Sequence, residues 1–147
     1  MAINKASVTK TNNLINTAAI LSSALQAQTE LLNFSFKYLA EKGEKFKYTI
    51  KDGDYFCQLK GRMKEVSKMT VNDFRSKYSP ALKNHLIRFH ETSESSFGII
   101  GEEQLVTEPF QFSIDRTNYG RVHGFILKNT FYIVWLDPSH ELYPGEN

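Results

Sequence analysis

The stretch GRVHGFILKNTFYIVWLDPSHELY, residues 120–143, contains the pattern that decides the fold. Two mostly apolar runs, 121–127 and 130–137, are separated by Lys128-Asn129, and this pair suits a tight hairpin turn because Asn tolerates positive φ. Asp137-Pro138 ends the second run, since Pro lacks the backbone N–H that a strand ladder needs. The stretch therefore predicts an antiparallel β-hairpin with strands at 121–127 and 130–137.

The alternation within this hairpin predicts which side chains share a face of the sheet. With Leu127 opposite Thr130, the expected pairs on one side are Phe125–Tyr132, His123–Val134 and Arg121–Leu136. The other side is wholly apolar and is the expected core face, with Val122 opposite Trp135 and the further members Ile126, Phe131 and Ile133. Arg121 and His123 are then expected together on the outer face.

Upstream segments predict further strands and helices. Strands are expected at 33–39, where aromatic and polar residues alternate, and around 110–114. Helices are expected at 54–69 and 70–78, the second because Thr70 and Asp73 resemble a capping box, and Ser79-Pro80 indicates another helix start. Residues 84–92 fit either a helix end or a strand, and 92–108 fit a long surface loop. The predicted fold class is α+β, with an antiparallel C-terminal β-meander packed against helices.

An amphipathic helix is predicted at 11–31, before this domain. Its apolar positions recur at helical spacing: Leu14, Ala18, Leu21, Leu25 and Leu32. Such a stripe either lies on the core of its own domain or docks on another chain, and both alternatives stay open here. The predicted organisation is an N-terminal helix within residues 1–32 and a single α+β domain at 33–147.

Composition bounds the class of protein. A chain of 147 residues with 41% apolar residues fits one hydrophobic core, and a formal charge of +2 does not by itself select a polyanionic partner. A lone cysteine excludes an internal disulfide framework and indicates a reducing compartment, so we expect a cytoplasmic protein. The N-terminal stretch is too polar for a signal peptide and too short for a membrane span, so no membrane partner is expected.

One group of polar residues is suited to chemistry on RNA. Arg121 begins one strand of the hairpin, and the tail after Pro138 emerges beside it, which would bring His140 and Tyr143 to the same end of the sheet as His123. An arginine that binds phosphate and a His or Tyr that moves protons suffice for metal-independent cleavage by the 2′-hydroxyl. The structural alternative is an ion pair between Arg121 and Asp137, with His123 an ordinary strand residue and the tail residues anchoring the chain end.

Other candidates point to structure rather than chemistry. The four histidines match no zinc signature, so we expect no metal and no cofactor. Cys57 lies beside Phe56 and Leu59 in a predicted helix, so a buried structural thiol is expected rather than a nucleophile. Three lysines at helical spacing form a stripe that fits either RNA phosphates or a solvated helix face: Lys60, Lys64 and Lys68.

The order of predicted elements, and above all residues 120–143, resembles the RelE/YoeB family of ribonuclease toxins. These toxins carry an arginine in a meander strand, a short polar hairpin turn, an apolar last strand, and then a basic or His residue and a Tyr. The resemblance implies that Arg121 binds the scissile phosphate, His140 is the general acid or base, and Tyr143 lies beside a base of the RNA. It also implies that Lys60 or Lys64 contributes charge and that an antitoxin is a partner.

Two functions from different classes follow. The first is a toxin-like, metal-independent endoribonuclease, with catalytic residues Arg121, His140 and Tyr143 and an RNA-binding set of Lys60, Lys64, Lys68 and His123. The second is a non-catalytic protein-interaction module of a bacterial mobile-element or defence-related system, which docks through the N-terminal helix or through the loop at 91–108, which contains five Glu and no Lys or Arg. A single cavity lined by Arg121, His140 and Tyr143 would favour the enzyme, whereas an Arg121–Asp137 pair and a buried His140 would favour the module.

Overall fold

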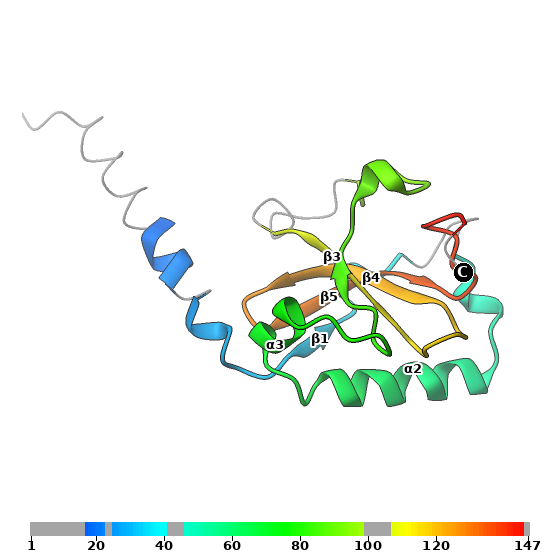
Figure 1. Ribbon diagram of the computed structural model, residues 1–147, viewed down its shortest axis with the longest axis horizontal. Helices are drawn as coiled ribbons and strands as arrows, with labels where there is room; N and C mark the ends of the chain where they lie inside the picture. The colour runs from blue at the N-terminus through cyan, green and yellow to red at the C-terminus, as the bar shows by residue number, and fades with distance from the viewer. Residues whose placement is uncertain (1–16, 23–24, 41–45, 99–106, 146–147) are drawn as a thin grey trace, which may run out of the picture.

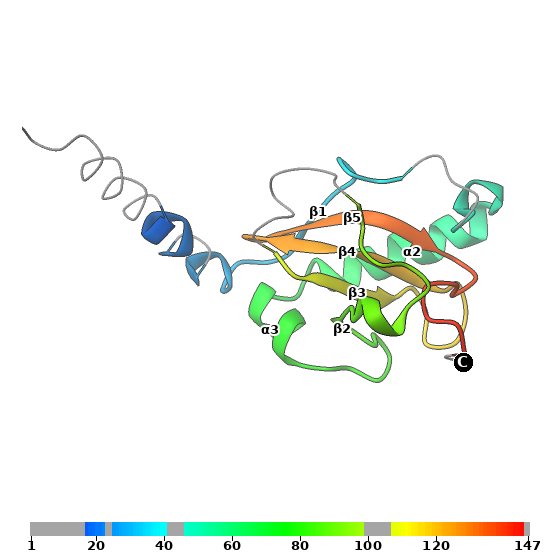
Figure 2. The same ribbon diagram turned by 90° about the horizontal axis from the view of Figure 1, so that it is seen from above.

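The computed structural model describes residues 17–22, 25–40, 46–98 and 107–145. Its centre is a five-stranded sheet with the order β1-β5-β4-β3-β2, and Figure 2 shows these strands side by side. The strands are β1 (Asn33–Ser35), β2 (His85–Leu86), β3 (Pro109–Ser113), β4 (Arg121–Leu127) and β5 (Thr130–Asp137). β1 pairs with β5 in parallel, whereas all other pairs are antiparallel. The α+β class and the C-terminal meander are confirmed, and β4 and β5 have the predicted bounds.

Helices α2 (Gly53–Val66) and α3 (Val71–Ser76) lie between β1 and β2 in the chain. Asp52 caps α2 by accepting a hydrogen bond from the backbone N–H of Tyr55 at 3.2 Å, and Thr70 caps α3 by accepting one from Asp73 at 3.1 Å. The predicted cap at Thr70 is confirmed. None of the helices in the described ranges is long and apolar enough to cross a membrane.

Several local predictions differ from the structure. The helix predicted to start at Pro80 is a single turn: the Ser79 hydroxyl and carbonyl accept the N–H groups of Leu82 and Lys83, and Lys83, with a positive φ of 49°, ends the turn there. The strand predicted at 33–39 ends at Ser35, the helix predicted at 54–69 ends at Val66, and the helix predicted at 70–78 ends at Ser76. Residues 84–92 contain β2 and the 3₁₀ turn η2 (Phe89–Glu91). Of the predicted loop at 92–108, residues 99–106 lie outside the described part.

A β-bulge changes the register of the central hairpin. The predicted pairs hold from Leu127–Thr130 to Gly124–Ile133, but His123 pairs with Trp135 and Arg121 with Asp137. One extra residue, Val134, is therefore accommodated in β5. The predicted pairs His123–Val134, Arg121–Leu136 and Val122–Trp135 are wrong by one position. Beyond the bulge, Leu136 replaces Trp135 on the core face.

The core lies between the sheet and the two helices. In Figure 1, α2 runs along one face of the sheet, and its buried residues are Tyr55, Leu59 and Val66. Phe74 of α3 is fully buried and meets the rings of Phe112 and Phe131 edge-on, with centroids 5.8 and 6.0 Å apart. Four of the five predicted core-face residues are confirmed in this cluster: Val122, Ile126, Phe131 and Ile133.

The opposite face of the sheet is also covered, by segments of the chain that contain no long helix. The cluster on this face, here the second cluster, consists of Phe46, Ile87, Phe97, Phe125, Val134, Leu142 and Tyr143, with Tyr38, Phe89, Tyr132 and Trp135 packed against it. Figure 1 shows the η2 segment and the C-terminal tail on this side. The expectation that Arg121 and His123 project from an outer face is therefore wrong, because both are buried beneath these segments.

The N-terminal segment is helical over residues 17–22 and 25–27 and extends away from the sheet in Figure 1. Its apolar side chains Ile20, Leu21 and Leu25 are 55%, 59% and 66% exposed, so this part of the predicted stripe does not lie on the domain core. The segment joins the body through backbone hydrogen bonds of residues 28–32 to the α3 region, such as Leu32 N–H to Met69 O at 3.0 Å. The part of the predicted helix before residue 17 lies outside the described residues.

A substitution at Gly124 tests how closely the backbone packs at the bulge. A Cβ added at this position would lie 2.0 Å from the Tyr132 carbonyl oxygen and 2.6 Å from the Phe131 ring. We expect Gly124→Ala to lower the free energy of unfolding by more than about 3 kcal/mol, measured by urea unfolding.

Gly61→Ala is the matched control, because a Cβ there meets nothing within 4 Å on α2. Its expected effect is a gain of about 0.5–1 kcal/mol. Equal stabilities of the two variants would contradict the close approach at Gly124.

Candidate functional site

Asp137, at the end of β5, is the centre of a buried polar cluster. Its carboxylate accepts three hydrogen bonds: from His123 Nε2 at 3.1 Å, from the backbone N–H of Glu141 at 2.8 Å and from that of Leu142 at 2.9 Å. Burial alone would raise the pKa of Asp137, but these bonds and the nearby His123 outweigh it and hold the pKa below its ordinary value. Asp137 is therefore an ionised anchor that joins the tail to the sheet.

His123 is completely buried beside this carboxylate. Phe46 and Trp135 flank its ring, with centroids 6.2 and 6.4 Å away. Because an ionised carboxylate can only accept, Nε2 must carry the proton shared with Asp137, and Nδ1 has no hydrogen-bond partner among the described residues. A second proton on Nδ1 would lack an acceptor there. Burial accordingly lowers the pKa of His123, in opposition to the charge of Asp137.

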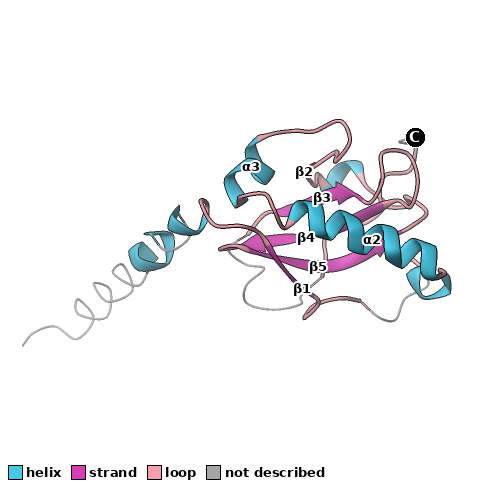
Figure 3. Cartoon of the chain, turned by 90° about the horizontal axis from the view of Figure 1, so that it is seen from below, coloured by secondary structure: helices cyan, strands magenta, loops and turns pink. Residues whose placement is uncertain are grey.

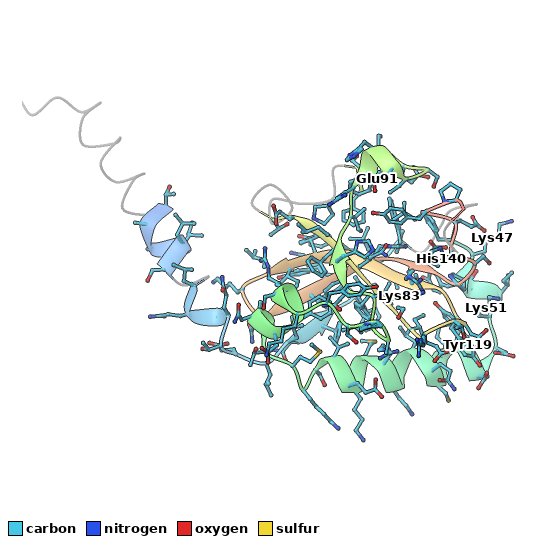
Figure 4. All side chains as sticks on the ribbon, in the orientation of Figure 1. Lys47, Lys51, Lys83, Glu91, Tyr119 and His140 are labelled. Atoms are coloured by element: carbon cyan, nitrogen blue, oxygen red, sulfur yellow. The ribbon has the colours of Figure 1, made fainter. Side chains whose placement is uncertain are left out.

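Arg121 and His140 lie close enough to His123 for their charges to act against its protonation. Arg121 is 5% exposed and stands opposite Asp137 in the register, with Nη1 donating to the Gly120 carbonyl at 3.2 Å. His140 is half-buried in the tail, at the end of the sheet shown in Figure 4, and its backbone N–H donates to the Asp137 carbonyl at 3.3 Å. The structure thus brings together three of the four predicted residues.

Tyr143 is the predicted residue that lies elsewhere. Its hydroxyl accepts the backbone N–H of Arg88 at 2.9 Å, and its ring meets that of His85 edge-on at 5.9 Å. It lines a cavity of about 530 Å³ whose lining includes neither Arg121 nor His140. Neither this cavity nor two others, of about 520 and 350 Å³, is lined by Arg121 or His140.

The lysine stripe lies on the far side of the sheet from His123. Lys60, Lys64 and Lys68 are exposed, whereas α2 turns Tyr55, Leu59 and Val66 toward the core. Figure 3 shows α2 lying across one face of the sheet, and His123 packs against the second cluster on the other face. The lysines therefore do not contribute to the surroundings of Asp137.

Helix α2 also contains the cysteine that was predicted to be buried. Cys57 is exposed, so the expected buried thiol is wrong: the residues that α2 buries are Tyr55, Leu59 and Val66. The pKa of Tyr55 is raised, mainly because the side chain is buried and further by the negative charge of Asp137.

Among the described residues no group of three or more His, Cys, Asp or Glu side chains could hold a metal ion.

The sequence pattern predicts Asp137 only as an ion-pair partner of Arg121 and does not indicate His85 or Arg88. An Asp followed by Pro at a strand end is a signal for a side chain that caps the following turn. Arg88 carried no such signal, because its place follows from where residues 84–92 meet the tail.

We compared the chain with family models, curated proteins and solved structures, and none of them matches.

The burial of His123 predicts a pH dependence of stability. Because burial lowers its pKa in the folded state, the unfolded chain takes up the proton first, so stability is complete above the ordinary pKa of 6.5 and is lost as the pH falls through it. The free energy of unfolding should decrease by at most about 1.4 kcal/mol per pH unit, measured by urea unfolding between pH 8 and pH 5.

His123→Gln keeps a donor for Asp137 but cannot titrate, and should remove this decrease. His90→Gln alters an exposed histidine and should leave it unchanged. The same decrease in both variants would assign it to other groups.

Proposed function

We propose that this chain is a protein-interaction module that docks on a partner protein through its N-terminal helical segment. The observation that supports this is the exposure of Ile20, Leu21 and Leu25 on helical residues outside the domain core. Large apolar side chains grouped in this way are typical of surfaces that another chain covers.

The energetics of helix formation support the proposal. Most helical stability in proteins comes from burying an apolar face. The core beneath the sheet is complete without residues 17–25, since α2 and α3 already cover that face. Burial of each leucine on a partner would contribute about 1.5–3 kcal/mol.

The charge pattern favours a protein over a polyanion or an anionic membrane. Between Lys10 and Lys37 the only charged residue is Glu30. Phosphate-bearing partners are bound mainly through Lys and Arg, and this segment has neither. The expected partner surface is therefore an apolar groove or helix face of another protein.

The docking proposal predicts that a charge in the apolar stripe prevents association. Leu25→Glu should reduce recovery of the partner at least about tenfold when the tagged chain is crosslinked and purified from its own cells, because a buried carboxylate costs several kcal/mol. Gln26→Glu is the matched control, since it adds the same charge at an exposed neighbouring position.

Equal recovery of the same partner with both variants would overturn the proposal. Light scattering on the purified chain separates self-association from a distinct partner. A monomeric chain that crosslinks to no specific protein would also count against docking.

A second candidate is the toxin-like endoribonuclease. The observation that favours it is the gathering of Arg121, His123 and His140 at one end of the sheet. Because Arg121 and His123 are buried, RNA could reach them only after the segments that cover this face of the sheet move away.

The ribonuclease candidate predicts that expression of the intact chain inhibits growth and cleaves RNA in a translating extract. Arg121→Lys and His140→Gln should each lower the cleavage rate at least about a hundredfold while the fold persists in circular dichroism. Lys128→Gln, in the exposed turn at the other end of the β4–β5 hairpin, should retain activity. Absence of cleavage by the intact chain would exclude this candidate and leave the docking proposal untouched.

A further inference from the structure

The strongest feature outside the Asp137 cluster is a cavity between α3, β2 and the C-terminal tail. Its volume, about 530 Å³, is in the range of small-molecule sites. We propose that this cavity binds a phosphate group carried on a planar ring, the chemistry of a nucleotide. The proposal goes beyond the docking function, because the cavity and the N-terminal helical segment are separate surfaces.

Two arginines from different elements supply the anion-binding groups. Arg75 is in α3 and Arg88 precedes η2, and both line the cavity. Their ion pairs are long, 3.5 Å to Glu108 and 3.6 Å to Glu91, and join largely exposed side chains. Such pairs contribute little to stability, so both guanidinium groups can turn toward a ligand. Guanidinium groups match the oxygens of a phosphate through paired hydrogen bonds.

Apolar and aromatic groups in the same cavity supply a place for a ring. Tyr78 and Leu86 are 62% and 42% exposed, whereas Phe110 and Tyr143 are buried. All four line the cavity, so exposed and buried apolar surfaces meet beside the two arginines. Ring stacking on an aromatic side chain stabilises bound bases without selecting their sequence.

The walls of the cavity are already fixed by hydrogen bonds. His85 is engaged at both ring nitrogens, 2.7 Å from the Leu86 carbonyl and 2.7 Å from the Gln111 side-chain amide. The Asn84 amide donates to the carbonyls of Phe74 at 2.6 Å and Lys77 at 2.9 Å. A preformed wall lowers the ordering cost of binding. Because both nitrogens of His85 are occupied, the cavity is suited to binding rather than to proton transfer.

The charge of the lining agrees with an anionic ligand. Arg75 and Arg88 face a single lining carboxylate, Glu91, and Glu108 pairs with Arg75 from outside the lining. A phosphate that takes both arginines would release these glutamates to solvent, where both already are exposed. Binding therefore leaves no buried charge without a partner.

Titration of the full chain with AMP, GMP, CMP and UMP by isothermal calorimetry tests the proposal. At least one monophosphate should bind, while inorganic phosphate and the matching nucleoside should each bind at least about tenfold more weakly, since each lacks one half of the recognised chemistry. A 5′-phosphorylated trinucleotide that binds more tightly than the monophosphate would identify the source as a strand end, and equal affinity would identify a free nucleotide.

Arg75→Ala and Arg88→Ala should each weaken binding about tenfold or more, because each removes charge-assisted hydrogen bonds. Arg116→Ala is the control, with the same loss of charge at an exposed turn outside the cavity. Circular dichroism checks that each variant is folded. Absence of binding by all four monophosphates at millimolar concentration, or equal binding by the three variants and the intact chain, would overturn the proposal.

Discussion

The carboxylate of Asp137 is the interaction on which the arrangement of the second face depends. It ends β5, holds His123 of β4 through its side chain and receives two backbone N–H groups of the tail. A buried carboxylate is costly unless such bonds compensate it, so the hydrogen bonds to Asp137 fix the position of the tail. Leu142 then completes the second cluster, and Tyr143 reaches the cavity beside Arg88. One ionised group thus couples the sheet end, the tail and a distant cavity wall.

Local pattern was enough to predict the central hairpin, because alternation and a two-residue turn are properties of neighbouring residues. The position of the bulge was harder to predict. Gly124 was visible as a strand glycine, yet the choice of Val134 as the extra residue depends on how the Tyr132 backbone and the Phe131 ring approach Gly124. One residue of slip moved Trp135 from the expected core face to the second cluster. Such a slip cannot be predicted from sequence periodicity, because the slip arises from contacts between strands.

The candidate site was predictable in part, for the same reason. The proximity of Arg121, His123 and His140 follows from hairpin geometry and was anticipated. Their burial depends on segments far away in the chain, such as Phe46 and Phe97, whose positions no local pattern encodes. That difference matters for function, because a substrate-binding role and an anchoring role require the same residue types and differ in access. The contrast with the open cavity near Arg88 comes entirely from tertiary packing.

The two edges of the sheet have a further consequence for how the molecule behaves among its neighbours. The inner strands β4 and β5 have 7 and 8 residues, while the edge strands β1 and β2 have only 3 and 2. Beyond β1, the backbone N–H of Ala40 donates to the Val134 carbonyl. This bond occupies part of the edge of β5 that β1 does not cover. Short edges give a foreign strand little to pair with, which is a common protection against fibrous aggregation. Concentrated solutions of this chain should therefore resist growth of the sheet from molecule to molecule.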